Sequence, residues 1–234
     1  LRPQQQPQMM PVMPIIQVTM LPNIANRQEW PAAYDENGGF CAFCQIDNTI
    51  NATCRPGGGP ITGGEQAPRV DRLVQQALWT GYKKVHGLKW QTIDLPNGMN
   101  LHCWGPASVR RNDNFTLTAS KVEEKLRVLQ ALQCLKYKCI GDSAYIDTDI
   151  IVNGGGKGIS AIREPIEWNY KDLKTLWTYL DYKHVLQLRK QPVAKFVLVC
   201  MILRNAHCTM YGNQSSEYFD FAPPSLEEWL SQGP

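Results

Sequence analysis

The chain has 234 residues, of which 43% are hydrophobic and 19% are charged, and its formal net charge is +3. This composition suits one large domain, or one domain with appendages, and the length allows a substantial core. The mildly basic balance permits a polyanionic partner without requiring one. The longest apolar run, at 196–203, is far shorter than the roughly 18 residues of a membrane span, so we expect no membrane contact.

The N-terminus and the cysteines bear on the cell compartment. The first residues lack the pattern of a secretory signal, and the sequence starts with Leu1, as a fragment would. Eight cysteines are too sparse for a disulfide scaffold, and most lie in apolar runs, where a reduced thiol acts as a small hydrophobe. Cys41 and Cys44 have Cys-x-x-Cys spacing, but no second pair follows, which favours core packing over zinc. We therefore expect a reduced, intracellular compartment.

The composition changes near residue 40. Residues 1–33 are rich in Pro, Gln and Met, which predicts an arm or linker before a folded domain at 34–222 and a C-terminal tail at 223–234. Residues 40–54 alternate well enough to predict a strand. The Gly- and Pro-rich stretch at 55–64 is typical of a loop.

The next part of the chain predicts a helix, a hairpin and a second helix. Apolar residues at helical spacing predict a helix at 70–84. Residues 88–105 read as two strands around a Pro-Asn-Gly turn, which is a strong hairpin signal. Residues 120–135 predict a helix capped by Ser120, with Glu123 three residues later as in a capping box.

The second half predicts a short strand at 137–145, a glycine-rich loop at 152–160 and a helix at 164–180 with Pro165 in its first turn. The segment at 192–211 is the most apolar helix, and we expect it to be central. An antiparallel unit followed by alternating helices and strands indicates an α/β fold with a mixed sheet covered by helices.

Three acidic residues stand at informative places. Asp47 is expected to end the first strand, Asp142 to end the later strand, and Glu167 to lie beside the apolar stripe of its helix. Their carboxylates converge if the strands are neighbours and the helix packs across them. Hard oxygen ligands suit Mg²⁺ or Mn²⁺, and two such ions can support phosphodiester cleavage. Spacing alone leaves open that the three acids are ordinary solvated residues.

The stretches "QIDNT", "CIGDSAY" and "IREPIEWNY" surround these acids and occur in this order. Between the first two lies "KVHGLKWQTIDLPNGMNLHCWGPASVRRND". The ordered set resembles the catalytic domain of DDE transposases of the PIF/Harbinger type, including their domesticated, nuclease-like relatives. The segment that contains Leu203, Asn205 and His207 is similar to the closing helix of that family. The likeness runs from about residue 40 to about residue 220.

The resemblance implies an RNase H-like fold, a mixed sheet with flanking helices, in which Asp47, Asp142 and Glu167 form a metal-binding catalytic triad. It further implies a nuclear (or cytoplasmic) DNA endonuclease that uses two Mg²⁺ or Mn²⁺ ions, with a Myb-like partner protein and homo-oligomers as further possibilities. Asn48 and Lys171 replace glycines common in the family, and the stretch between Asp142 and Glu167 is short. These departures leave open an alternative, a domesticated and catalytically inactive module that binds DNA or protein.

Basic residues near the motifs are candidates for phosphate contacts. Arg163 precedes Glu167 by four residues and is expected just before the helix, from where it would reach the same cleft. The pair Lys83 and Lys84 has the same potential, although paired basic residues are often a solvated face. Asp113 follows the hairpin as a fourth acid or as a turn residue. The predicted DNA-binding residues are Arg55, Arg110, Arg111 and Arg163.

Overall fold

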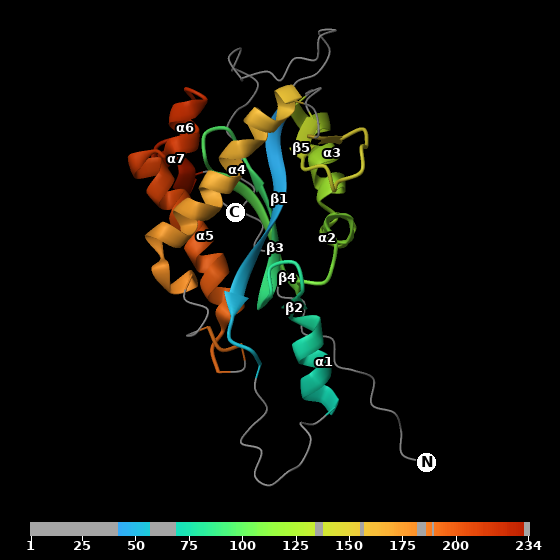
Figure 1. The fold of residues 1–234 in the computed structure, drawn as a ribbon. Helices are drawn as coiled ribbons and strands as arrows, with labels where there is room; N and C mark the ends of the chain where they lie inside the picture. Colours follow the sequence, from blue (N-terminus) through green and yellow to red (C-terminus); the bar gives the residue numbers. More distant parts are fainter. Residues whose placement is uncertain are drawn as a thin grey trace.

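The computed structural model describes residues 42–56, 69–133, 138–154, 157–181, 186–188 and 190–231. The expected arm at 1–33, most of the loop at 55–64 and Cys41 lie outside these residues. Within the described part, six strands form one sheet, and helices lie on both of its sides (Figure 1). This mixed α/β architecture confirms the expected RNase H-like fold class.

Strand β1 (Ala42–Thr53) lies in the middle of the sheet. It pairs antiparallel with β3 (Val85–Asp94) on one side and parallel with β5 (Lys138–Gly141) on the other. The far edge of β3 pairs with β2 (Trp79–Thr80) and with β4 (Asn100–Ser108), so the predicted hairpin is confirmed. Strand β6 (Ile151–Asn153) pairs parallel with β5 and was not predicted, because it lies at the start of the expected glycine-rich loop.

One face of the sheet is covered by α2 (Asp113–Ser120) and α3 (Val122–Gln133). Ile46 of β1, Ile93 of β3 and Leu126 of α3 are almost fully buried in this layer, together with Tyr145. Removing a large apolar side chain from water contributes roughly 1.5–3 kcal/mol of stability. These contacts therefore fix which face of β1 turns toward α3.

The opposite face of the sheet carries α4 (Lys157–Leu176), the short 3₁₀ helix η2 (Thr178–Leu180) and α5 (Val193–Tyr211). Trp90 of β3 packs there with Leu173 of α4 and Val197 of α5. The remaining described helices are α1 (Arg69–Ala77), α6 (Gln214–Tyr218) and α7 (Leu226–Ser231). In α7, inside the region expected to be a tail, Trp229 is buried against Met99 and Cys208.

Two predicted helix boundaries are wrong. The helix expected at 70–84 ends at Ala77, because Trp79 and Thr80 pair as strand β2 with His86 and Val85. The helix expected at 120–135 begins instead at Val122, because a separate helix, α2, ends at Ser120 and the backbone of Lys121 adopts the left-handed conformation. Ser120 closes α2 instead of capping α3, and its hydroxyl donates to Gln91 Oε1 at 2.6 Å.

Helix α4 also differs from the prediction, because it begins at Lys157 and runs past Pro165 instead of starting beside it. Proline lacks the backbone N–H that would continue the helix ladder, which usually ends or kinks a helix. Here the contacts with the sheet offset that loss. Pro165 and Ile166 are buried, and the carbonyl of Ile162 accepts a hydrogen bond from the Gln45 side chain of β1.

Helix α5 is less central than its apolar sequence predicts. Its buried side covers β4 and α4, while Val199, Leu203 and Met210 each remain about half exposed. By length and composition α5 could cross a membrane, since its most apolar window has a mean hydropathy of 1.3. Core helices of soluble proteins share these properties, so the absence of membrane contact stays a prediction.

Asn205 of α5 fastens the helix to strand β4. Its side-chain oxygen accepts from the Asn100 backbone N–H at 2.8 Å, and its amide nitrogen donates to the Asn100 carbonyl at 2.8 Å. The side chain thus acts as a neighbouring strand would, and it satisfies backbone groups at the edge of the sheet.

We predict that Asn205→Ala lowers the free energy of unfolding by about 1–3 kcal/mol, because both backbone groups of Asn100 lose their partner. Urea denaturation followed by circular dichroism measures this loss. Leu203→Ala, on the exposed side of the same helix, serves as the control and should stay within about 0.5 kcal/mol of the wild type. Equal losses in the two variants would contradict the role of Asn205.

Candidate active site

Asp47 lies in the middle of β1, opposite Thr92 of β3, and not at the end of the strand as predicted. Side chains alternate along a strand, so Ile46 enters the core beneath α3 while Asp47 turns toward α4. The strand continues past Asp47 because its later residues keep pairing with β3, as far as Thr53 opposite His86.

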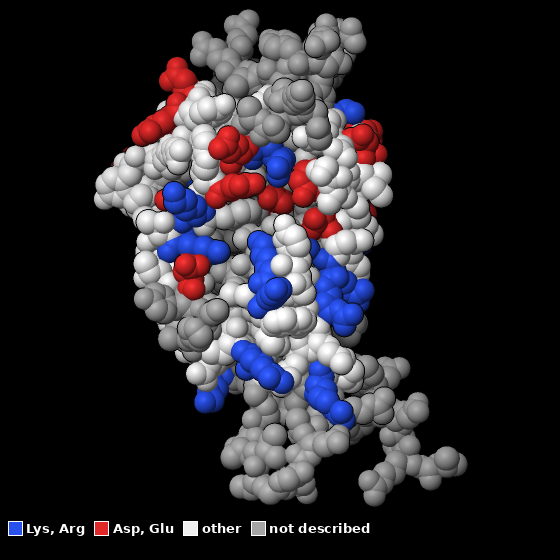
Figure 2. All heavy atoms as spheres, in the orientation of Figure 1, with Lys and Arg blue, Asp and Glu red and all other residues white. Residues whose placement is uncertain are grey.

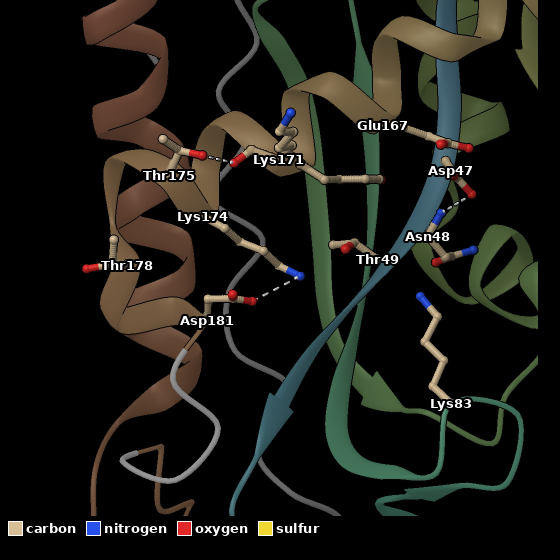
Figure 3. Close-up of a pocket in the computed structure, with 11 residues that line it drawn as sticks. Asp47, Asn48, Thr49, Lys83, Glu167, Lys171, Lys174, Thr175, Thr178 and Asp181 are labelled. Atoms are coloured by element: carbon tan, nitrogen blue, oxygen red, sulfur yellow. Dashed lines mark hydrogen bonds and ion pairs between the residues drawn. The ribbon is translucent and has the colours of Figure 1, made fainter.

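Asp47 and Glu167 line the same pocket between β1 and α4. Figure 3 shows Glu167 reaching from α4 toward Asp47 of β1. The pocket continues along α4 toward η2 and is bordered by three lysines. Its other lining residues are Asn48, Thr49, Lys83, Tyr170, Lys171, Lys174, Thr175, Thr178 and Asp181.

Asp142 follows β5 directly, as the sequence predicts. Its carboxylate accepts from the Ala144 backbone N–H at 2.9 Å, and its carbonyl accepts from the N–H of Tyr145 at 3.1 Å. This tight turn folds the Tyr145 ring over Gly141, where a Cβ atom would lie 2.6 Å from the ring. The glycine and the tyrosine of the "GDSAY" stretch therefore shape the turn that holds Asp142.

The carboxyl group of Asp47 sits in an electrostatically unfavourable place. Burial raises the pKa of Asp47 from 3.8 to about 7, and the negative charges of Asp142 and Asp113 act in the same direction. The hydrogen bond from the Asn48 N–H (2.7 Å) and the positive charge of Arg163 lower the pKa of Asp47, but only in part. The charged form of Asp47 is thus disfavoured chiefly by the loss of water around it, and in smaller part by its acidic neighbours.

Asn48 connects three elements around the site. Its side-chain nitrogen lies 2.8 Å from Asp113 Oδ1, 3.0 Å from Thr116 Oγ1 and 2.9 Å from the hydroxyl of Tyr145. It thereby links β1 to α2 and to the turn after Asp142. A glycine at this position could make none of these hydrogen bonds, so the departure from the family pattern has a structural role here.

Asp113 opens α2, while the cap itself is the preceding residue, Asn112, whose side chain accepts from the Phe115 N–H. Asp113 pairs with Lys89 of β3 at 2.9 Å, and both side chains are largely buried. The carboxylate is thus already engaged by an ammonium and by Asn48. It acts on the site mainly through its charge and through the position that it gives to Asn48.

The four predicted DNA-binding arginines lie in different parts of the structure, and none of them is among the residues that line the pocket. Arg163 lies inside α4, one turn before Glu167, and not ahead of the helix as expected. Arg55 follows β1, where it donates to Gln75 Oε1, and its side chain is exposed. Arg111 stacks on Phe115, with 4.4 Å between the guanidinium carbon and the ring centre. Arg110 borders a separate pocket beside Trp79.

Three lysines, Lys83, Lys171 and Lys174, line the pocket together with Asp47 and Glu167. Lys171 and Lys174 follow Glu167 by four and seven residues, so they share its face of α4. The sequence already shows this spacing, but it identifies pocket residues only once the structure shows which face of α4 borders the pocket. Figure 2 shows acidic side chains gathered in a band across this side of the molecule, with Lys and Arg over the part below it.

The carboxylate oxygens of Asp47, Asp142 and Glu167 are ligands of the kind that a hard divalent cation prefers. The three acids offer only oxygen ligands, and the crowded negative charge at Asp47 favours a cation. Among the described residues, no three His, Cys, Asp or Glu side chains come close enough together to hold an ion by themselves. Mg²⁺ takes one or two carboxylates and completes its shell with water and substrate phosphates, so it does not require such a closed cluster.

A comparison of sequences gives the family. A model of the DDE superfamily endonuclease family matches residues 65–205, more than half of the chain. The chain belongs to this family. No curated protein and no solved structure matches it.

Membership in the DDE superfamily endonuclease family supports a transposase-type nuclease, an enzyme class that generally uses divalent metals and acts on DNA. The matched residues include Asp142, Glu167 and most of the helical layer, but they begin after Asp47. The assignment of Asp47 to the candidate site is therefore based on the geometry of the pocket and on the sequence motif around Asp47, and not on the family match.

A second buried carboxyl group, Asp94, lies at the end of β3 on the same face as Asp47. It accepts from Thr92 Oγ1 (3.2 Å) and Asn100 Nδ2 (3.1 Å), and the Thr92 hydroxyl also lies 2.5 Å from the hydroxyl of Tyr170. Burial raises the pKa of Asp94 to about 6, although Arg204 and both hydrogen bonds oppose the shift.

We predict a pH-dependent effect of Asp94→Asn. In the unfolded chain the carboxyl group ionises near pH 3.8 and in the folded chain near pH 6, so Asp94 makes the free energy of unfolding fall as the pH rises between these values. The variant avoids this loss and should be more stable than the wild type by about 1–3 kcal/mol at pH 7.5. The difference should shrink toward pH 4.

Urea denaturation at pH 4 and pH 7.5 measures both values. Asp181→Asn, at an exposed carboxylate, is the matched control and should show no comparable change between the two pH values. A variant at Asp94 that is less stable than the wild type at pH 7.5 would contradict the prediction.

Proposed function

We propose that the protein is a divalent-metal-dependent DNA endonuclease whose metal ligands are Asp47, Asp142 and Glu167. The main support is that Asp47 and Glu167 line one pocket while the charge of Asp142 acts on Asp47. Three carboxylates from two strands and a helix, far apart in sequence, would otherwise repel one another without any gain in stability.

The proposed cofactor is a pair of Mg²⁺ or Mn²⁺ ions held by these carboxylates. When bound, such ions supply an activated water and neutralise the charge that develops on the phosphate in phosphodiester cleavage. The protein itself contributes the position of the ligands. Asn48 and Tyr145 hold the two strands together at the acids, and Arg163 balances part of the negative charge.

The pocket also suits a polyanionic substrate. Lys83, Lys171 and Lys174 border the pocket that contains Asp47 and Glu167, so a phosphate backbone could run past the acids along α4. Arg163 is the predicted DNA-binding arginine that acts most directly on the acids. Arg55, Arg110 and Arg111 would contact DNA only farther from the site.

The proposal extends to the transposase subtype, the location in the cell and the partners. The "QIDNT", "CIGDSAY" and "IREPIEWNY" motifs support a transposase-derived protein of the PIF/Harbinger type. A nuclear location, a Myb-like partner that supplies DNA specificity, and homo-oligomers follow from that subtype. The catalytically inactive binding module remains the alternative, and the metal titration below separates the two.

We predict that Asp47→Asn and Asp142→Asn each reduce metal-dependent nicking of supercoiled plasmid DNA roughly 100-fold or more, because an amide lacks the charge that binds the ion. The fold should persist, since asparagine is close in shape to aspartic acid. Asp149→Asn is the control, because Asp149 forms an exposed pair with Arg127. Unchanged nicking by the Asp47 and Asp142 variants would refute the assignment.

Calorimetric titration with Mn²⁺ tests the site without relying on activity. We expect the wild type and Asp149→Asn to bind Mn²⁺ alike and Glu167→Gln to bind it at least about tenfold more weakly. A wild-type protein that binds no Mn²⁺ at millimolar concentration, yet melts cooperatively, would instead support the inactive binding module.

A further inference from the structure

The turn between β2 and β3, residues 81–84, stands beside the candidate active site. Trp79 pairs with His86 and Thr80 with Val85, so four residues connect the two strands. Lys84 adopts the left-handed backbone conformation that closes the turn. Figure 3 shows Lys83 projecting from this turn toward Asn48 and Asp47.

Lys83 has no competing partner within the part of the chain that the structure describes. Its ammonium takes part in none of the ion pairs found there, whereas Lys174 pairs with Asp181 at 3.7 Å and Lys89 with Asp113. An ammonium that lines a pocket next to acids without pairing with them is available to a phosphate.

Tyr82, next to Lys83, is 92% exposed, more than the other exposed large hydrophobic residues of the described chain. An aromatic ring in this position adds nothing to the core. The turn thus presents an unburied ring at the residue before Lys83, a lysine that lines the pocket containing Asp47 and Glu167. Nucleic-acid-binding proteins combine the same two groups, a cation for the backbone and an aromatic face for a base.

The stacking of bases in DNA limits which bases a tyrosine ring can contact. A base inside a duplex has both faces covered by its neighbours, so away from the duplex ends a tyrosine ring can stack only on a base that is unpaired or extruded. Such a base would lie close to the phosphate that Lys83 contacts, and that phosphate would lie in the pocket that contains Asp47.

We propose that residues 81–84 form a nucleic-acid contact in which Lys83 binds a backbone phosphate and Tyr82 stacks on an unpaired DNA base beside it. This inference rests on the proposed nuclease function and makes it more specific. The substrate would carry unpaired nucleotides at the position where it meets the carboxylates.

DNA binding without cleavage tests the stacking contact. The probes are a duplex with a three-nucleotide single-stranded tail and a blunt duplex of equal length, each measured by fluorescence anisotropy in EDTA and again in Ca²⁺. Tyr82→Ala should weaken binding of the tailed duplex roughly 5- to 100-fold and binding of the blunt duplex less than about twofold. Tyr82→Phe should bind both probes like the wild type, because the ring is kept.

Tyr211→Ala is the matched control, since Tyr211 is 72% exposed but lies on α5, where neither neighbouring residue in the chain lines the pocket. It should bind both probes like the wild type. A 2-aminopurine in the tail should lose fluorescence on binding to the wild type and to Tyr82→Phe, and keep it with Tyr82→Ala.

Lys83 is tested separately. Lys83→Ala should weaken binding of both probes and reduce the slope of log affinity against log salt by about one, whereas Lys195→Ala, on the exposed side of α5, should not. An unchanged slope would overturn the phosphate contact.

Three results would overturn the stacking contact. They are unchanged binding of the tailed duplex by Tyr82→Ala, equal weakening on both probes, and a wild type that binds neither probe in either buffer. Measuring Mn²⁺ binding by Tyr82→Ala distinguishes a failure of the stacking contact from a failure of the proposed nuclease function. If Mn²⁺ binding and nicking persist while the stacking results fail, only the role of the turn is wrong.

Discussion

The parallel pairing of β1 with β5 is the constraint on which the candidate site depends. Gln45 lies opposite Ile140 in this register, and two residues further along each chain come Asp47 and Asp142. The hydrogen bonds of the sheet therefore bring together the carboxylates of Asp47 and Asp142, whose negative charges repel each other. The raised pKa of Asp47 reflects this repulsion and, above all, the loss of water around the carboxyl group. A cation bound between the strands would relieve both effects.

Several neighbouring residues hold the site in place although none of them is a proposed ligand. Gly141 leaves room for the Tyr145 ring, and the hydroxyl of Tyr145 meets Asn48 on the adjacent strand. Asn48 in turn contacts Asp113, which is fixed by Lys89. This chain of contacts runs along the side of the sheet opposite α4. Asn48 also lines the pocket that contains Asp47 and Glu167, so it joins these supporting contacts to the candidate site.

The charge of this pocket is unevenly distributed, which suits a phosphodiester substrate. Asp47 and Glu167 lie at one end, and Lys83, Lys171 and Lys174 border the rest, where Asp181 pairs with Lys174. A strand of nucleic acid laid along α4 would find cations for its phosphates and meet the carboxylates at one point. Tyr82, the residue before Lys83, is 92% exposed and would add an aromatic face at the β2–β3 turn, which no basic surface alone provides.

Some of these features could be predicted from local patterns. The Pro-Asn-Gly turn between β3 and β4, the long apolar helix α5 and the position of Asp142 directly after β5 follow from turn chemistry, hydrophobic spacing and a strand-ending Gly-Asp step. The order of the acidic motifs also indicated the family. Each of these signals lies within a few neighbouring residues, which is the range over which backbone preferences act.

Other features were decided by contacts between distant segments. Strand β1 continues beyond Asp47 because it pairs with β3. Helix α4 continues past Pro165 because it packs on β1. Trp79 and Thr80 form a strand and not a helix because they pair with β3. The place of Lys171, Lys174 and Lys83 beside Asp47 likewise depends on how α4 and the β2–β3 turn meet the sheet. The sequence alone determined which residues were available and in what local conformation. Only the tertiary structure decided which of them face one another, because strand pairing and helix packing join residues whose separation along the chain carries no local pattern.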